Sequence, residues 1–455
     1  MNGASGSAVD GANLDVERPL VLGFGVVGQA LVRALKQRGH QPIVADDRPT
    51  DAGRLLADEL GVELIAAPSR ERLSRLVADA SVLLPSPGVP DHHPAFQAAR
   101  EFGVGVRSEL DLAARWDDRP LASITGTNGK TSVTMMVTDA LERSGVRAAA
   151  VGNTDVPLIT AIDDATIEVF VVEASSFRLG HSHRFSPAVG TWINYAPDHL
   201  DAHASAASYE AAKASIWSHL RPEALVVANA DDPVVMRNVP ESHDRIELFS
   251  LIDSGASWRV DGDELVGPDG AFAEISDLQR KQPHDVANAL AVAATAVGAG
   301  ATIEGVADAV RLFAGLPHRL ELVGEWDGIV WYNDSKATVP QATEAAVMGF
   351  DSVVLIAGGK NKGLALDGLR STVPPVRHVV AIGDSEKDVT DVFAGLVPVT
   401  GAGDMAAAVA AAGEVAQPGD AVVLSPGCAS FDWYPNYAER GLDFSRLVRE
   451  RATRS

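Results

Sequence analysis

Short apolar runs alternate along the chain with longer segments in which apolar residues recur every three or four positions. The first pattern is typical of strands buried in a parallel sheet, and the second of amphipathic helices. The runs predict strands over 19–22, 42–45, 82–84, 121–124, 166–172, 188–194, 225–229, 329–333, 353–357, 379–383 and 421–424. Because strands and helices alternate from one end of the sequence to the other, we predict an α/β fold of parallel sheets covered by helices.

The length of 455 residues and the spacing of these elements predict three domains. A stretch rich in Gly, Ala, Ser and Asn predicts a disordered tail over 1–17. A Rossmann-like domain is then expected over 18–114, a central P-loop ATPase-like domain over 115–318, and a C-terminal Rossmann-like domain over 319–455. The polar segment 115–120 is interpreted as the first linker.

One glycine-bearing segment lies between a predicted strand and a predicted helix, and we call it the phosphate loop: Thr125-Gly126-Thr127-Asn128-Gly129-Lys130-Thr131. Its glycines would let backbone N–H groups converge on phosphate oxygens, next to the partial positive charge of a helix N-terminus. Lys130 would reach the outer phosphates of a nucleoside triphosphate, and the Thr131 hydroxyl would bind Mg²⁺. Ile124 stands where the common, longer motif has its first glycine. An ordinary strand-to-helix turn is the alternative interpretation.

Acidic and basic side chains follow the next strands of the same predicted sheet. Glu173 ends the strand over 166–172, where a carboxylate is well placed for magnesium. The strand over 188–194 leads into two histidines and two aspartates within 198–203, which indicate either a transition-metal site of a hydrolase or one magnesium ligand with solvated neighbours. Lys213, in a predicted helix over 209–220, reads by composition as a solvated lysine.

The first domain carries a weaker nucleotide motif. Its first strand is followed by Gly23-Phe24-Gly25-Val26-Val27-Gly28, and an Asp46-Asp47 pair comes about twenty residues later, as in dinucleotide-binding folds. The spacing alone leaves three interpretations open: an NAD site, a site for another nucleotide diphosphate, or the fold without a ligand. The segment 85–90, which contains Gly88, is either a ligand loop at a strand end or a rigid turn.

Basic residues mark the strand ends of the last domain, where open α/β sheets bind ligands. Lys336, Lys360 and Lys362 each follow a predicted strand, and together they favour an anionic ligand. Arg319 lies at the junction of the last two domains, where it either reaches a phosphate or is a surface residue.

Composition and net charge limit the classes of binding partner and the cellular compartment that suit this chain. The chain has 38 Lys and Arg against 61 Asp and Glu, a net charge of −23, which disfavours nucleic acid and anionic membranes as partners. Cys428 is the one cysteine, so an intramolecular disulfide is excluded and a reducing compartment fits. The sequence has neither a signal-peptide pattern nor an apolar run of membrane-spanning length. We therefore expect a cytoplasmic protein.

From about Leu20 onward the chain resembles the Mur ligase family over nearly its whole length. The motifs shared with that family, and with folylpolyglutamate synthase, are the phosphate loop, Glu173, Asp198-His199-Leu200-Asp201, Lys213 and Asp334-Ser335-Lys336. The segment Ser425-Pro426-x-x-Ala429-Ser430-x-Asp432, with Tyr437 and Arg440-Gly441, narrows the resemblance to the members that add D-glutamate. Asp285 and Tyr437 depart from it, because the family usually has asparagine and phenylalanine there.

The resemblance implies an ATP-dependent acid–amino-acid ligase that joins D-glutamate to UDP-N-acetylmuramoyl-L-alanine through an acyl phosphate, in peptidoglycan precursor synthesis. It implies ATP, two Mg²⁺ ions and a carbamylated lysine as cofactors, and a monomer as the working form. Another Mur-type or folylpolyglutamate-type ligase, a metal hydrolase, and a non-catalytic nucleotide-binding protein are the alternatives.

The resemblance also implies residue roles. The implied catalytic residues are Lys130, His199 and Lys213. The implied ATP site is Gly126, Thr127, Asn128, Gly129, Lys130, Thr131, Asn288, Arg319 and Asp334. The implied metal ligands are Thr131, Glu173, His199 and Lys213 as its carbamate. The implied site for the UDP-linked substrate is Val26, Val27, Asp46, Asp47, Arg48, Gly88 and Asn153. The implied D-glutamate site is Thr338, Lys362, Ser430 and Tyr437.

Overall fold

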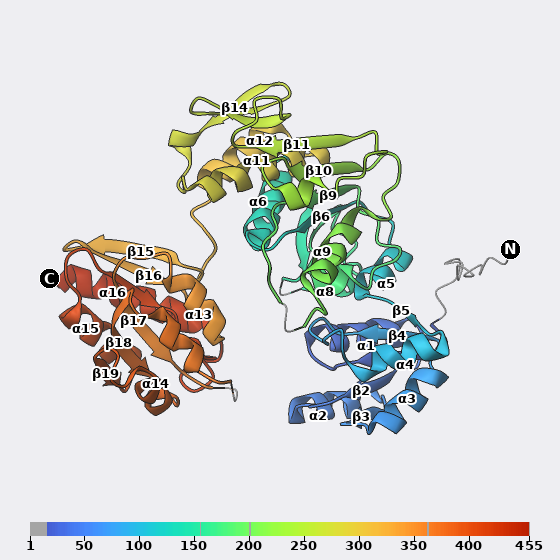
Figure 1. Ribbon diagram of the computed structural model, residues 1–455, viewed down its shortest axis with the longest axis horizontal. Coiled ribbons are helices and arrows are strands. Elements are labelled where there is room, and N and C mark those ends of the chain that lie inside the picture. The colour runs from blue at the N-terminus through green and yellow to red at the C-terminus, as the bar shows by residue number, and fades with distance from the viewer. Residues whose placement is uncertain (1–15, 155, 200–201, 362–363, 455) are drawn as a thin grey trace. The chain divides into compact units, whose positions relative to one another are not determined.

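The computed structural model describes residues 16–154, 156–199, 202–361 and 364–454, and Figure 1 labels its helices and strands. The described residues form sheets of five, nine and six strands, nearly all parallel, which confirms the predicted α/β class. The chain divides into two compact units, Met1–Phe313 and Ala314–Ser455. The first unit holds the first two sheets, and each unit is described by itself below.

The first sheet has the strand order β3-β2-β1-β4-β5 and is parallel throughout, as expected for a Rossmann-like domain. Its strands are β1 (Pro19–Leu22), β2 (Ile43–Asp46), β3 (Leu64–Ala66), β4 (Val82–Pro85) and β5 (Gly105–Val106). Its helices are α1 (Val26–Gln37), α2 (Asp51–Leu60), α3 (Arg70–Asp79) and α4 (Pro94–Phe102). Of the predicted disordered tail only its last residues are described, and Val16 among them is buried in the core.

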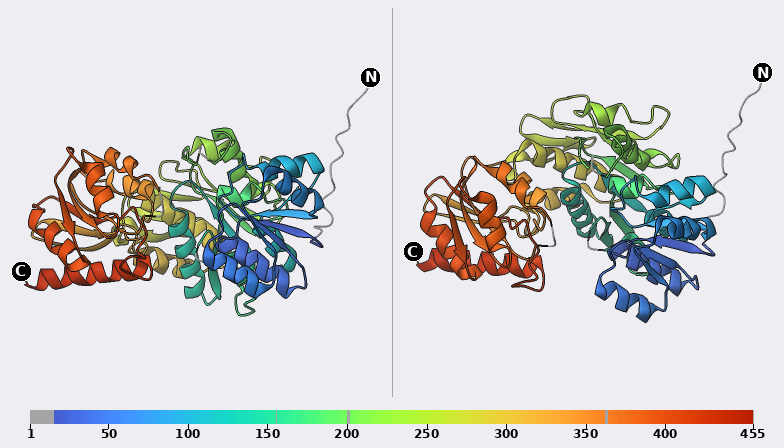
Figure 2. Two further views of the ribbon diagram at one scale, coloured as in Figure 1. Left: turned by 90° about the horizontal axis from the view of Figure 1, so that it is seen from below. Right: turned by 60° about the horizontal axis from the view of Figure 1, so that its bottom comes forward.

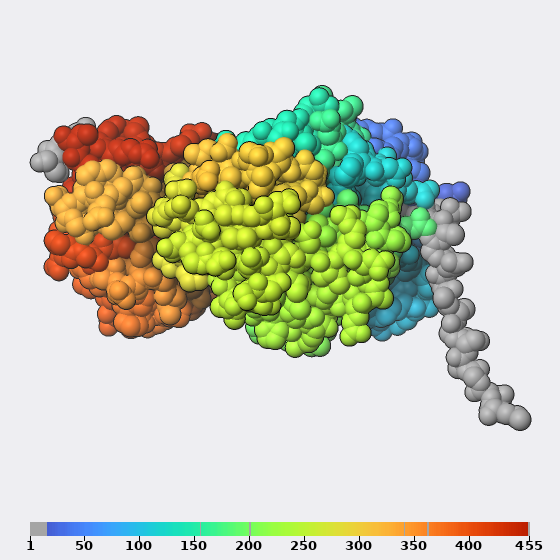
Figure 3. All heavy atoms as spheres, turned by 90° about the horizontal axis from the view of Figure 1, so that it is seen from above, coloured from blue at the N-terminus to red at the C-terminus, as the bar shows by residue number. Residues whose placement is uncertain are grey.

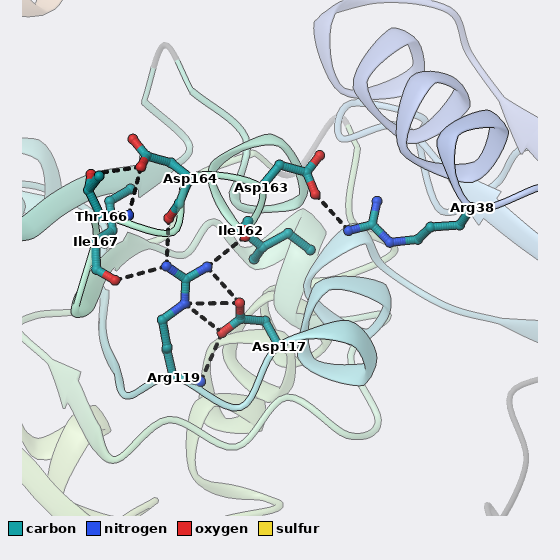
Figure 4. A network of polar contacts seen from close by, with 8 residues as sticks. All are labelled: Arg38, Asp117, Arg119, Ile162, Asp163, Asp164, Thr166 and Ile167. Atoms are coloured by element: carbon teal, nitrogen blue, oxygen red, sulfur yellow. Dashed lines mark hydrogen bonds and ion pairs between the residues drawn. The ribbon is translucent and has the colours of Figure 1, made fainter.

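A short linker joins the first sheet to the second. Helix α5 (Glu109–Trp116) continues beyond the predicted start of this linker at residue 115. The Arg119 guanidinium then binds the Asp117 carboxylate and the carbonyls of residues 162, 164 and 167, as Figure 4 shows. In the same view Arg38 of α1 reaches Asp163, with 2.7 Å between Nη2 and Oδ1. These contacts fix the chain where it passes between the two sheets.

The central sheet has the order β14-β13-β12-β11-β10-β9-β6-β8-β7. Its strands are β6 (Leu121–Thr125), β7 (Ala148–Gly152), β8 (Val169–Glu173), β9 (Val189–Trp192), β10 (Leu225–Asn229), β11 (Ile246–Ser250), β12 (Trp258–Asp261), β13 (Glu264–Gly267) and β14 (Gly270–Glu274). Strands β6 to β12 pair in parallel, and β13 and β14 turn back as an antiparallel extension at one edge. Figure 3 shows this extension at the surface of the first unit, beside α12 (Ile303–Leu312).

The other helices of the central sheet are α6 (Lys130–Arg143), α7 (Leu158–Ala161), α8 (Ser176–Leu179), α9 (Ala206–Ala214), α10 (Pro233–Met236) and α11 (Pro283–Gly298), with 3₁₀ turns at Ser215–Trp217 and Ile275–Asp277. Helix α9 starts three residues before the predicted helix over 209–220 and ends six residues before the predicted end, at Ala214. Its start is set by a capping box, in which Ser205 and Ser208 bind each other's backbone N–H.

One hydrophobic core runs continuously from the first sheet into the second. It includes Val21 and Leu84 of the first sheet, Leu112 of α5, and Phe170 and Trp192 of the central sheet, all buried. Because apolar side chains of both sheets share this core, the two sheets belong to one compact unit.

The second unit is a six-stranded sheet of order β15-β16-β20-β17-β18-β19, in which β15 alone is antiparallel to its neighbour. Its strands are β15 (Glu321–Trp326), β16 (Ile329–Asn333), β17 (Val353–Gly358), β18 (Val376–Ile382), β19 (Val399–Ala402) and β20 (Ala421–Leu424). Its helices are α13 (Pro340–Val347), α14 (Glu386–Phe393), α15 (Met405–Val415) and α16 (Tyr437–Arg454), with a 3₁₀ segment over Asp367–Thr372.

Alternate residues of the buried strands face opposite sides of this second sheet. Val354 and Ile356 of β17 lie in one core cluster, while Val353 and Leu355 lie in another. Both views of Figure 2 show helices on the two faces of the sheet, so the prediction of a doubly wound domain is confirmed. No helix in the described parts of either unit is long and apolar enough to cross a membrane.

Candidate active site

The phosphate loop connects β6, an inner strand of the central sheet, to the first turn of α6, as the sequence predicts. Two of its positions require glycine. A Cβ on Gly126 would lie 2.4 Å from the Ile193 side chain, and Gly129 has a φ of +80° with the Asn288 amide close beside it. The first turn of α6 follows directly, and its N–H groups have no carbonyl within the helix to bind. This arrangement suits phosphate oxygens.

Asn194, which lies just beyond β9, holds the front of the loop. Its Oδ1 accepts the N–H groups of Thr127 at 2.9 Å and Asn128 at 3.0 Å, and its Nδ2 donates to the Asn128 carbonyl. The Lys130 ammonium donates to the carbonyls of Gly126 and Thr127. The loop is therefore already folded, with its cationic side chain lying along it.

Lys213 is buried rather than solvated, contrary to the interpretation from composition. It is 1% exposed, its Nζ donates to the Gly126 carbonyl at 2.6 Å, and it lies 4.5 Å from the ring centre of Tyr209. Burial, with the nearby charge of Lys130, lowers the pKa of Lys213 to about 6. Near neutral pH this amine is therefore largely uncharged.

Glu173 ends β8 next to the phosphate loop, because β8 pairs with β6 in a register that sets Glu173 beside Ile124. It is 2% exposed. Its Oε1 accepts a hydrogen bond from Asn153 at 3.1 Å, while its Oε2 is buried with no hydrogen-bond partner in the described residues. A buried carboxylate oxygen without a partner, close to a phosphate loop, fits Mg²⁺.

The two histidines of the 198–203 segment have different surroundings. The His199 side chain is half exposed, has a φ of +52°, and lies 5.3 Å from the Phe177 ring. His203 is buried and faces Ser176 and Asp91 instead. Asp201 lies outside the described residues, among which no group of three or more His, Cys, Asp and Glu side chains could hold a metal ion.

The glycine-rich turn of the first domain is held by the aspartate at the end of β2. Asp46 accepts the N–H of Phe24 at 2.6 Å through Oδ2 and that of Arg48 at 2.7 Å through Oδ1. Gly88, with a φ of +94°, lies in the loop after β4. Ser86 in the same loop donates to the Gly23 carbonyl at 2.8 Å.

The other first-domain residues predicted to bind the UDP-linked substrate lie at the start of α1 and after β2. Val26 begins α1 and is 67% exposed, Val27 is buried, and Asp47 contacts His93. The predicted UDP-site residues of the first domain thus lie at the start of α1, at the end of β2 and in the loops after β2 and β4. Strand β1 pairs with both β2 and β4, so these positions belong to neighbouring strand ends.

A cavity of about 610 Å³ opens beside the phosphate loop. Gly129, Asn288 and Tyr195 line it, together with the loops after β10 and β11. Asp285, the departure from the family pattern, pairs with Arg280 at 3.0 Å, and its Oδ2 is buried without a partner in the described residues. Asn288, and not Asp285, is the member of this helix turn that faces the loop.

In the second unit the predicted residues follow β16 and β20. Asp334 accepts the Ser425 hydroxyl at 2.7 Å and the N–H of Leu320, and burial raises its pKa to about 6. Tyr437 begins α16, with the Lys336 ammonium 5.3 Å from its ring centre, and Ser430 is 2% exposed. Arg319 lies just before β15, and Thr338 lies between β16 and α13. Lys362 lies outside the described residues.

The sequence interpretation missed three residues at the site. These are Asn194, Tyr209, whose hydroxyl lies 3.2 Å from the Thr127 hydroxyl, and Ser175, whose buried hydroxyl has no partner in the described residues. Asn194 follows the strand next to the phosphate loop, a position that does carry a signal. Nothing in the pattern marks Tyr209, because an aromatic residue in a helix usually belongs to a core.

Three family models match the chain in order. They are "Mur ligase MurD-like, N-terminal domain" over 17–108, "Mur ligase middle domain" over 124–296 and "Mur ligase, glutamate ligase domain" over 318–428. The fold and the matched domains define an ATP-dependent ligase that forms amide bonds. Within that class, the chain belongs to the Mur ligase family.

Curated relatives match nearly the full length. The UDP-N-acetylmuramoylalanine–D-glutamate ligase of Frankia casuarinae is 39% identical over 452 residues, covering 95% of this chain and 94% of the relative. The ligase of the same name from Symbiobacterium thermophilum is 36% identical over 455 residues, covering 95% of this chain and 98% of the relative.

Solved structures are similar in fold. A pseudomurein peptide ligase type C from Methanothermus fervidus has a TM-score of 0.53 at 16% identity, covering 96% of this chain and 99% of that one. MurF from Acinetobacter baumannii has a TM-score of 0.52 at 17% identity, covering 95% and 94%. At such identities these neighbours support the fold alone.

Proposed function

We propose that the protein joins D-glutamate to UDP-N-acetylmuramoyl-L-alanine with cleavage of ATP to ADP and phosphate, a step of peptidoglycan precursor synthesis. The observation that carries this proposal is the near full-length identity to relatives named UDP-N-acetylmuramoylalanine–D-glutamate ligase. The preformed phosphate loop, with Lys213 and Glu173 beside it, supports it.

The chemistry requires activation, because a carboxylate is a poor electrophile. Transfer of the γ-phosphoryl group of ATP to the alanyl carboxylate gives an acyl phosphate, whose phosphate leaves when the amine of D-glutamate attacks the carbonyl carbon. The protein mainly supplies positioning and positive charge for anionic groups. Lys130 and the first turn of α6 would bind the ATP phosphates, while exclusion of water would prevent hydrolysis of the acyl phosphate.

Glu173, Thr131, His199 and a modified Lys213 would hold magnesium, which neutralises phosphate charge when bound. The uncharged state of Lys213 supports the modification, because only a neutral amine reacts with CO₂ to form a carbamate and release a proton. The carbamate would add a second carboxylate to a site where Glu173 already has an unpartnered oxygen.

The remaining predicted residues keep their roles in this proposal. The UDP-linked substrate would bind at the loops of Val26, Val27, Asp46, Asp47, Arg48 and Gly88, with Asn153 near its alanyl end. Asn288, Arg319 and Asp334 would contact ATP. Thr338, Lys362, Ser430 and Tyr437 would bind D-glutamate. A monomer acting in the cytoplasm remains our expectation.

Phosphate release from ATP, measured with UDP-N-acetylmuramoyl-L-alanine and with D-glutamate present or omitted, tests the proposal. We expect release that requires both substrates, and its loss in Lys130→Ala with binding of the UDP-linked substrate retained. Release without D-glutamate, or turnover without ATP, would contradict the proposal. Binding of NADH in place of UDP-N-acetylmuramoyl-L-alanine would instead support the dinucleotide interpretation of the first domain.

A further inference from the structure

His203 belongs to the histidine and aspartate segment, but the proposed reaction gives it no role. Its side chain is 3% exposed, and both ring nitrogens have partners. Nε2 lies 2.9 Å from the Ser176 hydroxyl, and Nδ1 lies 3.2 Å from Asp91 Oδ2. Since a carboxylate only accepts, Nδ1 donates to Asp91, and in the neutral imidazole Nε2 then accepts from the Ser176 hydroxyl.

The two partners of His203 come from different domains. Asp91 belongs to the loop after β4, three residues beyond Gly88, and its backbone N–H also donates to the Ala202 carbonyl at 3.0 Å. Ser176 begins α8, three residues beyond Glu173. His203 thus bridges the loop proposed to bind the UDP-linked substrate and the loop that carries the proposed magnesium ligand.

Ring contacts also connect His203 to the neighbourhood of the phosphate loop. The His203 ring stacks on Phe177 at 5.0 Å with an interplanar angle of 16°, and the Phe177 ring lies 5.3 Å from that of His199. The His203 ring also lies 5.3 Å from Tyr209, whose hydroxyl is 3.2 Å from that of Thr127. These contacts need only a ring at position 203, whereas the contacts with Asp91 and Ser176 need its two nitrogens.

The order Ser176, His203, Asp91 is also that of a hydrolytic triad. Ser176 borders a cavity of about 530 Å³ but is itself only 2% exposed, which is unfavourable for a nucleophile that must meet the carbonyl of an ester or amide. The geometry points to a positioning role: we propose that His203 holds the substrate loop of the first domain against the loop of Glu173 and so aligns the alanyl carboxylate with the metal ligands. This inference rests on the proposed function.

The test uses the full-length protein and direct binding of UDP-N-acetylmuramoyl-L-alanine by calorimetry. His203→Phe keeps a ring on Phe177 and removes both hydrogen bonds. Interaction energies between contacting residues change an equilibrium constant by factors of roughly 2 to 150. We therefore expect the Kd of UDP-N-acetylmuramoyl-L-alanine to increase about tenfold, while the Kd of ATP stays within about twofold of wild type. Adding Asp91→Asn to His203→Phe should cause little further loss of affinity for the UDP-linked substrate, because the hydrogen bond between residues 203 and 91 is already absent.

Two more variants separate positioning from general stability. His203→Gln can still donate to Asp91 and accept from Ser176, so it should recover part of the affinity lost in His203→Phe. His181→Gln is the matched control, because His181 stacks on Phe96 of the first domain at the same domain junction. Its Kd for the UDP-linked substrate should stay within about twofold of wild type.

Three results would overturn the inference. The first is an unchanged Kd for the UDP-linked substrate in His203→Phe, and the second is an equal increase in the Kd of ATP. The third is a double variant whose increase in Kd is the product of the increases in the two single variants. Failure of the proposed function is distinguished by the wild type, which would then release no phosphate in the presence of D-glutamate. Provided that the wild type binds UDP-N-acetylmuramoyl-L-alanine, the binding measurements test His203 whether or not phosphate is released.

Discussion

Lys213 has surroundings in which a protonated amine is unfavourable. It is buried against a tyrosine ring, with one carbonyl as its hydrogen-bond acceptor and the charge of Lys130 nearby. Composition gave no sign of this, because a lysine between small residues in a helix is usually solvated. Only the fold, which sets α9 against the phosphate loop, reveals it.

The pKa of Lys213 gives a pH dependence with a definite sign. Because the folded-state pKa is lowered from 10.5 to about 6, the unfolded chain binds more protons between these values, and the stability of the unmodified protein rises with pH across that window. Carbamate formation needs the neutral amine, so activity should fall as pH decreases through about 6 and should rise with added bicarbonate. A carbamate signal in ¹³C NMR with labelled bicarbonate would check this.

Lys213→Ala is the matched variant for this prediction. It should be inactive, lack the carbamate signal, and recover part of its activity with added acetate or formate, which can occupy the place of the lost carboxylate. Full activity of Lys213→Ala without a rescuing acid would contradict the role.

Single residues also mark the limit of sequence interpretation at the site. The phosphate loop and Glu173 could be located from the sequence. Glycines mark positions where the backbone needs space or an unusual conformation, and the carboxyl ends of parallel strands lie at the edge where such sheets bind ligands. The separation of His199 from His203 could not be predicted, because it depends on Asp91, more than a hundred residues away in sequence.

At the scale of elements, the loops of the second unit depend on one buried cation. Arg440 of α16 is 1% exposed and donates to the Ser335 hydroxyl and carbonyl at 2.9 Å and to the Cys428 carbonyl at 3.1 Å. Burial lowers its pKa to about 10, so it stays charged at neutral pH. It thereby ties the loop after β16 to the loop after β20.

Arg440→Leu should destabilise the second unit by about 2–4 kcal/mol, because it leaves buried carbonyl groups without donors. Urea unfolding followed by hydrogen exchange of peptides from residues 314–455 would measure the loss. Arg449→Leu on the exposed side of the same helix is the control and should change stability by less than about 0.5 kcal/mol. Equal effects of the two variants would refute the role of Arg440.

Element types were largely predictable, since buried parallel strands give continuous apolar runs. The element ends were less so. Helix α9 starts at Ala206 because of a serine capping box, and α5 runs on to Trp116 through a segment whose polarity resembles a linker. Both differences come from local polar contacts that an apolar pattern does not contain.

At the scale of the molecule, the first unit is held by a buried ion pair as well as by its continuous core. Glu109 of α5 and Arg178 of α8 form a charged contact with side-chain exposures of 1% and 4%, and Glu109 also accepts the N–H of Ile159. Removal of one partner leaves the other charge buried and unpaired.

Glu109→Gln should therefore lower the stability of the first unit by about 3–5 kcal/mol and leave the second unit unchanged. Hydrogen exchange in peptides from residues 16–313 and 314–454 would report the two units separately. Glu71→Gln, which removes an exposed contact with Arg75, is the control and should have little effect. A loss of protection spread over both units would contradict the division into two compact units.

The hydrophobic core shared by the first two sheets has a consequence for engineering and for evolution. A chimaera that exchanges only residues 18–114 for those of another ligase would cut through packed side chains such as Leu84, Leu112 and Phe170. A graft at the boundary between Phe313 and Ala314 would leave both cores intact. If the second unit binds the amino acid and the first sheet the nucleotide-linked acid, as proposed, new amino acids should be acquired by recombination more readily than new nucleotide-linked acids.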